Sequence, residues 1–272
     1  MNGNEIMGLK NLKEHYKIKG VVSNYEKLRF FSLSGRVQHN REIFIINKII
    51  EQINPKFLLE IAVGPGRITK DIKFPYNAVG VDSSEEMIIE AKKFCNEKWS
   101  FLVSDIMRMP FKKEMFDMIY TFRLIPHFKK DEREKSYKEI YRVLKNKGCF
   151  VMNIGNKSYK KPQIIKLLVD FYHIINPVKK QKYLPKVYNV NLTLNEIKGE
   201  LEKNNFFVKK VYNTNYHNTL NLFLLVLAKS IKFLDKFAMN YLINSEDRNQ
   251  HKLNKYAEFI LVCEKNGKYK RT

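Results

Sequence analysis

The chain has 272 residues, enough for one full-sized α/β core with additions, and its hydrophobic fraction of 44% excludes a disordered protein. A balance of 50 Lys and Arg against 28 Asp and Glu gives a net charge of +22, which favours phosphate-rich partners or anionic membrane surfaces; a lysine-rich composition throughout the chain explains it equally well. The three cysteines have no C-x-x-C spacing, so the sequence indicates neither a disulfide framework nor a metal site.

The first two stretches of the chain differ in pattern. Residues 1–40 carry basic and aromatic side chains among Gly and Ser with no single hydrophobic period, so we separate them from a domain at 41–272. From Arg41 to Ile53, apolar residues recur at helical spacing, which predicts a helix packed on a sheet.

The next stretch predicts a strand and a ligand-binding loop. The apolar run Phe57–Ile61 is too short for an amphipathic helix and predicts a buried strand of a parallel sheet. Glu60 stands at its carboxyl end, where ligands bind in open α/β sheets, and a carboxylate there can accept hydrogen bonds from a ribose or an ammonium group. Small residues follow at alternate positions and let a ligand approach the backbone: Ala62, Gly64 and Gly66. We expect a short helix over residues 68–73.

Two further strands end in acidic residues. Ala78–Val81 predicts a strand that ends in Asp82, about 20 residues after Glu60, which is the distance that one βαβ step needs to bring a second carboxylate to ribose hydroxyls. Ser83 and the residues after it predict the start of a helix that runs to about residue 96 and turns Met87 and Phe94 inward. A third strand, at residues 101–103, is followed by Asp105.

A dinucleotide cofactor fits this loop less well. A G-x-G-x-x-G motif needs a third glycine three positions after Gly66, and Thr69 stands there.

The remaining chain predicts a continued alternation of strands and helices. The predicted strands are Phe116–Phe122, Cys149–Ile154, Phe206–Tyr212 and Tyr256–Glu264, and the predicted helices are Lys129–Leu144 and Leu194–Asn204.

Five stretches together resemble the class I S-adenosylmethionine-dependent methyltransferases, in particular the branch of ubiquinone- and menaquinone-biosynthesis and small-molecule enzymes. They are LLEIAVGPGRIT, VGVDSSEEMIIEAKK, FLVSDIMRMPF, FDMIYTFRLIPHF and EIYRVLKNKGCFVMNIG. The resemblance covers roughly Phe57 to Gly155, over a third of the chain. It implies a Rossmann-like α/β fold: a seven-stranded, mostly parallel sheet with a final antiparallel strand, helices on both faces, and helical insertions.

The resemblance also implies an S-adenosylmethionine site. Glu60, Gly64 and Gly66 would line the methionine part, Asp82 would hold the ribose, and Asp105 with Ile106 would face the adenine. Ala62 stands where the family usually has glycine. Our full set of expected cofactor contacts is Glu60, Ala62, Gly64, Gly66, Asp82, Ser83, Met87, Asp105, Ile106 and Phe122.

The acceptor side is expected beside the fourth strand. His127 is the candidate general base, because an unperturbed histidine with a pKa of about 6.5 is mostly neutral at pH 7; a solvated histidine is the simpler alternative. Arg123 is a candidate substrate contact. In this family the leading segment commonly covers the site as a lid, which adds Tyr25, Arg29 and Arg36, although a surface-packed helix and loop explains these three as well.

Two lysine-rich insertions, at about 156–193 and 213–254, are expected to define the acceptor. We expect methyl transfer to a small or lipid-like molecule; the alternatives are an RNA methyltransferase and a non-catalytic protein of the same fold. The basic insertions offer a surface for RNA or an anionic membrane, or they pack on the domain. No apolar run reaches the roughly 20 residues of a membrane span, and we expect a cytoplasmic protein, either free or peripheral at a membrane.

Overall fold

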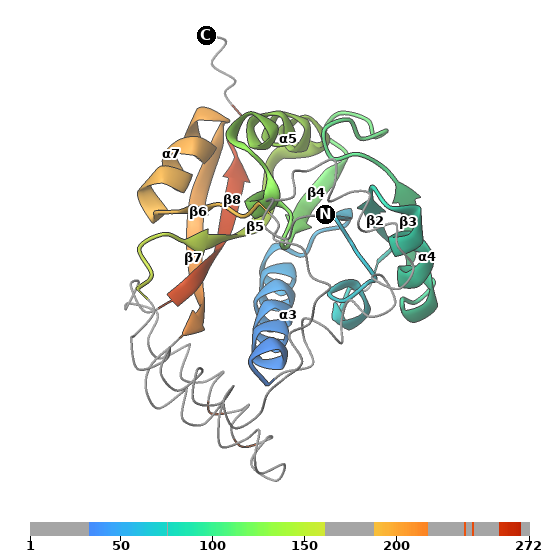
Figure 1. Ribbon diagram of the computed structural model, residues 1–272. Coiled ribbons are helices and arrows are strands. Elements are labelled where there is room, and N and C mark those ends of the chain that lie inside the picture. The colour runs from blue at the N-terminus through green and yellow to red at the C-terminus, as the bar shows by residue number, and fades with distance from the viewer. Residues whose placement is uncertain are drawn as a thin grey trace, which may run out of the picture.

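A single twisted sheet forms the centre of the protein (Figure 1). The computed structural model describes residues 33–74, 76–160, 188–216, 237, 241 and 256–267. Tyr25, Arg29 and most of the two basic insertions lie outside the described residues. The strands are β1 (Leu58–Ile61), β2 (Ala78–Asp82), β3 (Trp99–Val103), β4 (Phe116–Thr121), β5 (Leu144–Asn156), β6 (Asn191–Leu192), β7 (Phe206–Tyr216) and β8 (Tyr256–Lys265).

The order of the strands is β3-β2-β1-β4-β5-β8-β7. β1 is parallel to β2 and β4, and β8 is antiparallel to both β5 and β7, so the predicted mostly parallel sheet with an antiparallel last strand is confirmed. The short β6 was not expected; it pairs with β5 at Gly155 and Asn156, beyond the register that β5 shares with β4.

Helices cover both faces of the sheet (Figure 1). They are α3 (Leu33–Ile53), α4 (Glu85–Phe94), α5 (Lys130–Val143) and α7 (Leu194–Lys203), with single 3-10 turns η1 (Thr69–Asp71) and η2 (Ile125–His127). Side chains along β4 point alternately to the two faces of the sheet and so contribute to two hydrophobic cores. Ile119 packs with α5 and α7, whereas Met118 and Tyr120 pack with the isoleucines of α3. This arrangement is the three-layer fold that the alternating strand and helix patterns predicted.

Four local features differ from the expectations. α3 begins at Leu33 and therefore crosses the boundary expected at residue 40. In place of the helix expected over 68–73 there is only the 3-10 turn η1, because residues 64–68 form turns and the helical stretch is correspondingly short. Phe94, expected inward, is 58% exposed on the last turn of α4. β5 begins at Leu144 and not at Cys149, where the strand was expected to start.

No helix among the described residues is both long enough and apolar enough to cross a membrane.

Candidate active site

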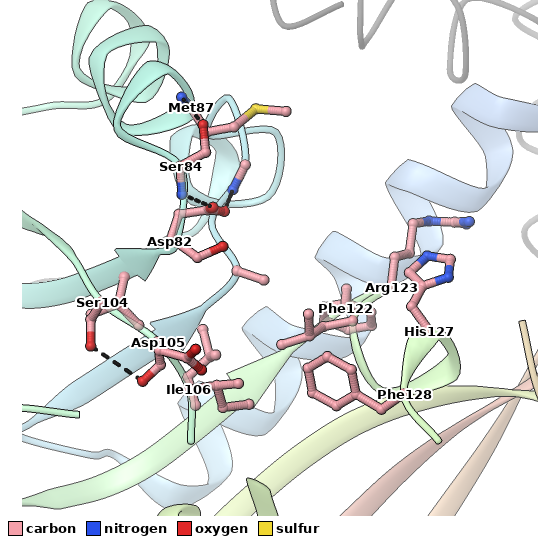
Figure 2. Close-up of a pocket in the computed structure, with 16 residues that line it drawn as sticks. Asp82, Ser84, Met87, Ser104, Asp105, Ile106, Phe122, Arg123, His127 and Phe128 are labelled. Carbon is pink, nitrogen blue, oxygen red and sulfur yellow. Dashed lines mark hydrogen bonds between the residues drawn. The ribbon is translucent and has the colours of Figure 1, made fainter. Parts of the chain in front are cut away.

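A cleft opens at the carboxyl ends of β1, β2 and β4 (Figure 2). It encloses about 820 Å³ of empty space, part of which is open to solvent. The residues that line it are Ile61, Ala62, Gly64, Val81, Asp82, Ser83, Ser84, Met87, Ser104, Asp105, Ile106, Phe122, Arg123, Leu124, His127 and Phe128. Eight of the ten expected cofactor contacts are thus brought together; Glu60 and Gly66 do not line this cleft.

The loop after β1 forms the floor of the cleft, and three of its residues have a left-handed backbone conformation. Ala62, Gly64 and Gly66 have φ values of 59°, 58° and 83°. A Cβ added at Gly64 would meet no other heavy atom within 4 Å, so the space beside this residue is open to a ligand. At Gly66 the added atom would come 2.9 Å from Cys95 Sγ, so this glycine lets the loop pack closely against the end of α4.

Asp82 joins β2 to this loop. Its two carboxylate oxygens accept hydrogen bonds from the backbone N–H groups of Gly64 at 2.8 Å and Ser84 at 3.0 Å (Figure 2). Burial raises the pKa of Asp82, while the backbone hydrogen bonds to Ser84, Gly64 and Ser83 lower it. Ser84 Oγ in turn accepts from Met87 N and caps α4, so the carboxylate is held in place at the cleft wall. The three backbone donors leave the carboxylate one further acceptor position, which a hydroxyl group can use.

The rest of the cleft lining includes several apolar side chains. Ile106 and Phe122 are buried side chains on its surface, and Met87 adds a thioether from α4. Asp105, by contrast, is exposed, and its Oδ1 accepts a hydrogen bond from Met107 N at 2.9 Å. An apolar slot with one acidic residue at its rim suits a flat heteroaromatic group.

Glu60 points beneath the loop and not into the main cleft. Its Oε2 accepts hydrogen bonds from Thr69 Oγ1 at 2.6 Å and Tyr120 Oη at 2.7 Å, and the residue is 3% exposed. Burial raises the pKa of this carboxyl to about 7, although both hydroxyl donors and the charge of Arg67 lower it.

A second cavity lies next to the main cleft and is lined in part by Glu60; its empty space of about 320 Å³ includes a part that is open to solvent. It shares Ala62, Gly64, Phe122 and Arg123 with the main cleft, so these four residues lie between the two spaces. Arg67 also lines it. The second cavity therefore offers one carboxylate and two guanidinium groups.

Arg123 and His127 both line the main cleft, on the segment after β4 where the sequence analysis expects the acceptor. Arg123 has a left-handed backbone with a φ of 61°, and its N–H donates to Asn153 Oδ1 at 2.6 Å. His127 Nδ1 lies 2.8 Å from the carbonyl oxygen of Tyr188. Because a carbonyl only accepts, Nδ1 carries the hydrogen in this contact and Nε2 is the basic nitrogen of the neutral ring. Arg36 lies on α3 and does not line the cleft that the described residues form.

Comparison with known proteins identifies the family. Residues 59–152 match the family described as "Methyltransferase domain". An uncharacterised protein of Methanocaldococcus jannaschii is 29% identical over 75% of this chain and 83% of its own length. The malonyl-[acyl-carrier protein] O-methyltransferase of Legionella pneumophila is 27% identical over 46% of this chain and 45% of its own, and the sterol 24-C-methyltransferase of Aspergillus fumigatus is 33% identical over 34% and 26%.

Solved structures share the fold. The magnesium protoporphyrin IX methyltransferase of Synechocystis, solved with bound S-adenosylhomocysteine, superposes with a TM-score of 0.57 at 10% identity over 94% of this chain and 99% of its own. A phosphoethanolamine N-methyltransferase of Haemonchus contortus gives 0.56 at 19% identity over 94% of this chain and 59% of its own.

Residues 59–152 form a class I S-adenosylmethionine-dependent methyltransferase domain. This segment runs from β1 to β5 and contains the cofactor loop, all three strand-end acids and His127. The enzyme interpretation is thereby supported over a non-catalytic protein of the same fold, and S-adenosylmethionine is the cofactor of this family. The ubiquinone-like sub-branch stays a prediction.

The sequence interpretation missed a polar cluster of this methyltransferase, formed by Gln38, His39, Glu42, Arg67, Asp71 and Glu258. One signal was present: Glu42 falls at helical spacing with Ile45, Ile46 and Ile49, so a charged residue interrupts the apolar stripe of α3. A carboxylate at such a position needs a buried cationic partner.

Proposed function

We propose that this methyltransferase transfers the methyl group of S-adenosylmethionine to a small or lipid-like acceptor that enters beside Arg123 and His127. The observation that carries the proposal is that the two cavities lie side by side and share Ala62, Gly64 and Phe122 in their lining. A long, bent site with an apolar slot, a carboxylate and a charged end matches the adenine, ribose and amino-acid tail of the cofactor.

The proposed cofactor contacts follow the chemistry of each part of the site. Ile106, Met87 and Phe122 pack on the adenine and Asp105 accepts from it, while Asp82 accepts from the ribose hydroxyls with Ser83 at the same rim. In the second cavity Glu60 faces the ammonium of the tail, and the guanidinium groups of Arg67 and Arg123 face its carboxylate.

When bound, the cofactor supplies a methyl group that its sulfonium already activates. The residues of the chain therefore act by positioning and by excluding water. The cofactor and the acceptor would meet between the apolar side chains of Phe122 and Phe128, which line the cleft at that point. Nε2 of His127, made basic by the Tyr188 contact, accepts the proton of an oxygen or nitrogen acceptor.

Two relatives give the acceptor class its support. The Aspergillus relative is a sterol methyltransferase and the Legionella relative acts on malonyl-[acyl-carrier protein], so related domains serve lipid and acyl acceptors. The matched regions cover less than half of either relative, so these relatives support a class of acceptor and no particular molecule.

The test is a turnover assay of S-adenosylhomocysteine release with lipid and quinone-like extracts as acceptors. His127→Ala should lower kcat by about 100-fold, because a lost general base costs at least that much, and should leave cofactor affinity within about twofold. Lys130→Ala, an exposed change outside the cleft, is the control and should behave as wild type. An unchanged kcat in His127→Ala contradicts the proposed base.

An RNA acceptor is the second candidate, and the net charge of +22 favours it. RNA binding that weakens steeply as salt rises, together with release of S-adenosylhomocysteine in the presence of RNA and not of lipid extracts, would select this candidate.

A further inference from the structure

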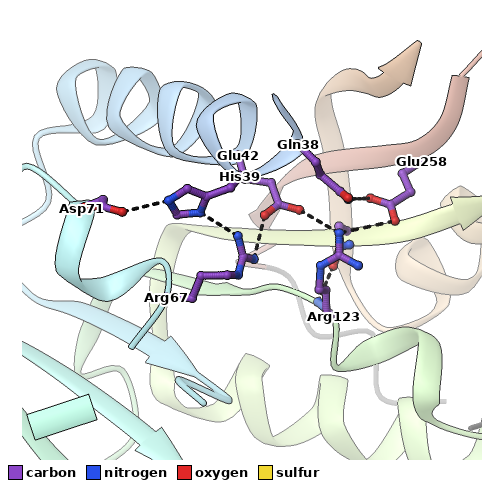
Figure 3. Close-up of polar contacts among 8 residues, drawn as sticks. Gln38, His39, Glu42, Arg67, Asp71, Arg123 and Glu258 are labelled. Atoms are coloured by element: carbon purple, nitrogen blue, oxygen red, sulfur yellow. Dashed lines mark hydrogen bonds and ion pairs between the residues drawn. The ribbon is translucent and has the colours of Figure 1, made fainter. Parts of the chain in front are cut away.

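Beside the cleft, α3 contributes three polar side chains to a network that reaches both cavities (Figure 3). The network joins four parts of the chain: α3, the loop with η1, the segment after β4, and β8. Its members are Gln38, His39, Glu42, Arg67, Asp71, Arg123 and Glu258.

Glu42 stands between the two arginines. One carboxylate oxygen lies 2.7 Å from Arg67 Nη2, and the other accepts from Arg123 Nη2 at 3.4 Å (Figure 3). Arg67 comes from the cofactor loop and Arg123 from the acceptor segment, so one carboxylate contacts both sides of the site. Glu42 is 1% exposed and lines neither of the two cavities.

A second contact fixes the other end of the Arg67 guanidinium. Its Nη1 lies 2.8 Å from His39 Nδ1, and His39 Nε2 lies 2.8 Å from Asp71 Oδ2. A guanidinium only donates, so Nδ1 is the acceptor and Nε2–H donates to Asp71. Burial and the charge of Arg67 both lower the pKa of His39, which keeps the ring in this neutral form.

Arg123 has a second acidic neighbour. Its Nη2 lies 3.9 Å from Glu258 Oε1, and Gln38 Nε2 donates to Glu258 Oε2 at 2.8 Å. Burial raises the pKa of Glu258, whereas the charge of Arg123 lowers it. These contacts steer the side chain of a residue whose backbone is already held in a left-handed conformation.

Stability alone is a poor reason for this arrangement. Burying a carboxylate is costly, and replacing a buried ion pair by apolar side chains is often neutral or stabilising. The apolar stripe of α3 offers such a replacement at the position of Glu42, next to Ile45 and Ile46 in the core. What an apolar residue cannot do is direct two guanidinium groups.

We infer that Glu42 is a positioning residue, which holds the guanidinium groups of Arg67 and Arg123 in the directions that bind the carboxylate tail of the cofactor. The inference rests on the proposed function. A glutamine at position 42 keeps one acceptor oxygen but turns an NH₂ donor toward the other arginine, which has only donors, so one guanidinium must be released.

The test of this inference is whether Glu42→Gln raises or lowers the KM for S-adenosylmethionine in the turnover assay. Positioning predicts that Glu42→Gln raises this KM about tenfold and leaves kcat within about threefold, because the tail keeps its charge during methyl transfer and its contacts are equal in the ground and transition states. A purely electrostatic effect acts the opposite way: removing a negative charge beside two arginines would lower the KM. An unchanged or lowered KM overturns the inference.

The matched control is Glu200→Gln. Arg133 on α5 donates from Nε and Nη2 to the two oxygens of Glu200 on α7, both at 2.7 Å, in a second largely buried pair that lines neither of the two cavities. This variant should lose stability and keep the wild-type KM. If Glu42→Gln does not fold, Glu42→Asp is the variant to measure, since it keeps the negative charge but moves the carboxylate away from the two guanidinium groups. An intermediate rise in the KM for S-adenosylmethionine supports positioning, and a wild-type KM overturns it.

The two proposals fail in different ways. Wild-type protein that releases no S-adenosylhomocysteine with any acceptor overturns the proposed function and the inference with it. Active wild type and an unaffected Glu42→Gln protein overturn the inference alone.

Discussion

Replacing the buried acid beneath the cofactor loop should stabilise the protein in a pH-dependent way. Glu60→Gln removes a carboxylate that is 3% exposed and whose pKa burial raises from its ordinary 4.5 to about 7. The glutamine carbonyl can still accept hydrogen bonds from Thr69 and Tyr120, which both donate to one oxygen of Glu60. The change therefore tests the cost of the charge more than the loss of contacts.

The direction and size follow from the two pKa values. Between pH 4.5 and about 7 the unfolded chain has lost the proton of Glu60 while the folded chain still holds it, so wild-type stability falls as the pH rises through this window. The difference corresponds to roughly 3 kcal/mol at 1.36 kcal/mol for each tenfold change in acidity constant. Glu60→Gln should match wild type near pH 4.5 and exceed it by up to about 3 kcal/mol at pH 8.

Urea unfolding of both proteins between pH 4.5 and 8 measures this difference, and contributions of other titrating groups cancel in the comparison. Equal stabilities across the range, or a Glu60→Gln protein that is less stable at pH 8, would refute the reasoning. The proposed contact with the cofactor ammonium adds a second expectation: the stabilised variant should bind S-adenosylmethionine more weakly.

Two other changes in the cofactor loop give definite expectations. Ala62→Gly should raise the free energy of unfolding by about 0.5–1 kcal/mol in urea titrations, because a φ of 59° strains an alanine and not a glycine; a less stable variant would show that Ala62 is unstrained. Asp82→Asn turns an amide NH₂ toward one of the backbone donors of Gly64 and Ser84, so calorimetry should show at least about a tenfold loss of S-adenosylmethionine affinity, and wild-type affinity would remove Asp82 from the site.

The fold was largely predictable because its signals are local. Each parallel strand is a short apolar run, and the acids at 60, 82 and 105 mark where three of these runs end. The cleft at their carboxyl ends follows from parallel pairing of β1 with β2 and of β2 with β3.

The direction of Glu60 was also present in the pattern but was not used. Side chains alternate along a strand, so Glu60 shares a face with Leu58, which packs in the α3 core together with Tyr120. The register that pairs Glu60 with Tyr120 then places the acid beneath the loop. This alternation already indicates that Glu60 lies on the α3 side of the sheet, next to the second cavity and outside the main cleft.

The Glu42 network lay beyond prediction for a different reason. It joins side chains of α3 to Arg123 and to Glu258 on β8, far along the chain, and no local period carries such a pairing. The close packing of Gly66 against Cys95 and Ala91 was not predictable either, because a glycine that admits a ligand and a glycine that admits a neighbouring helix look alike in a sequence.

The most direct test of the central claim is calorimetric titration of the full-length protein, freed of copurified cofactor, with S-adenosylmethionine and S-adenosylhomocysteine. The proposed site predicts that both bind with one-to-one stoichiometry and that Gly64→Val, which fills the open space beside the loop, abolishes the binding of both. A folded protein that binds neither molecule would contradict the account.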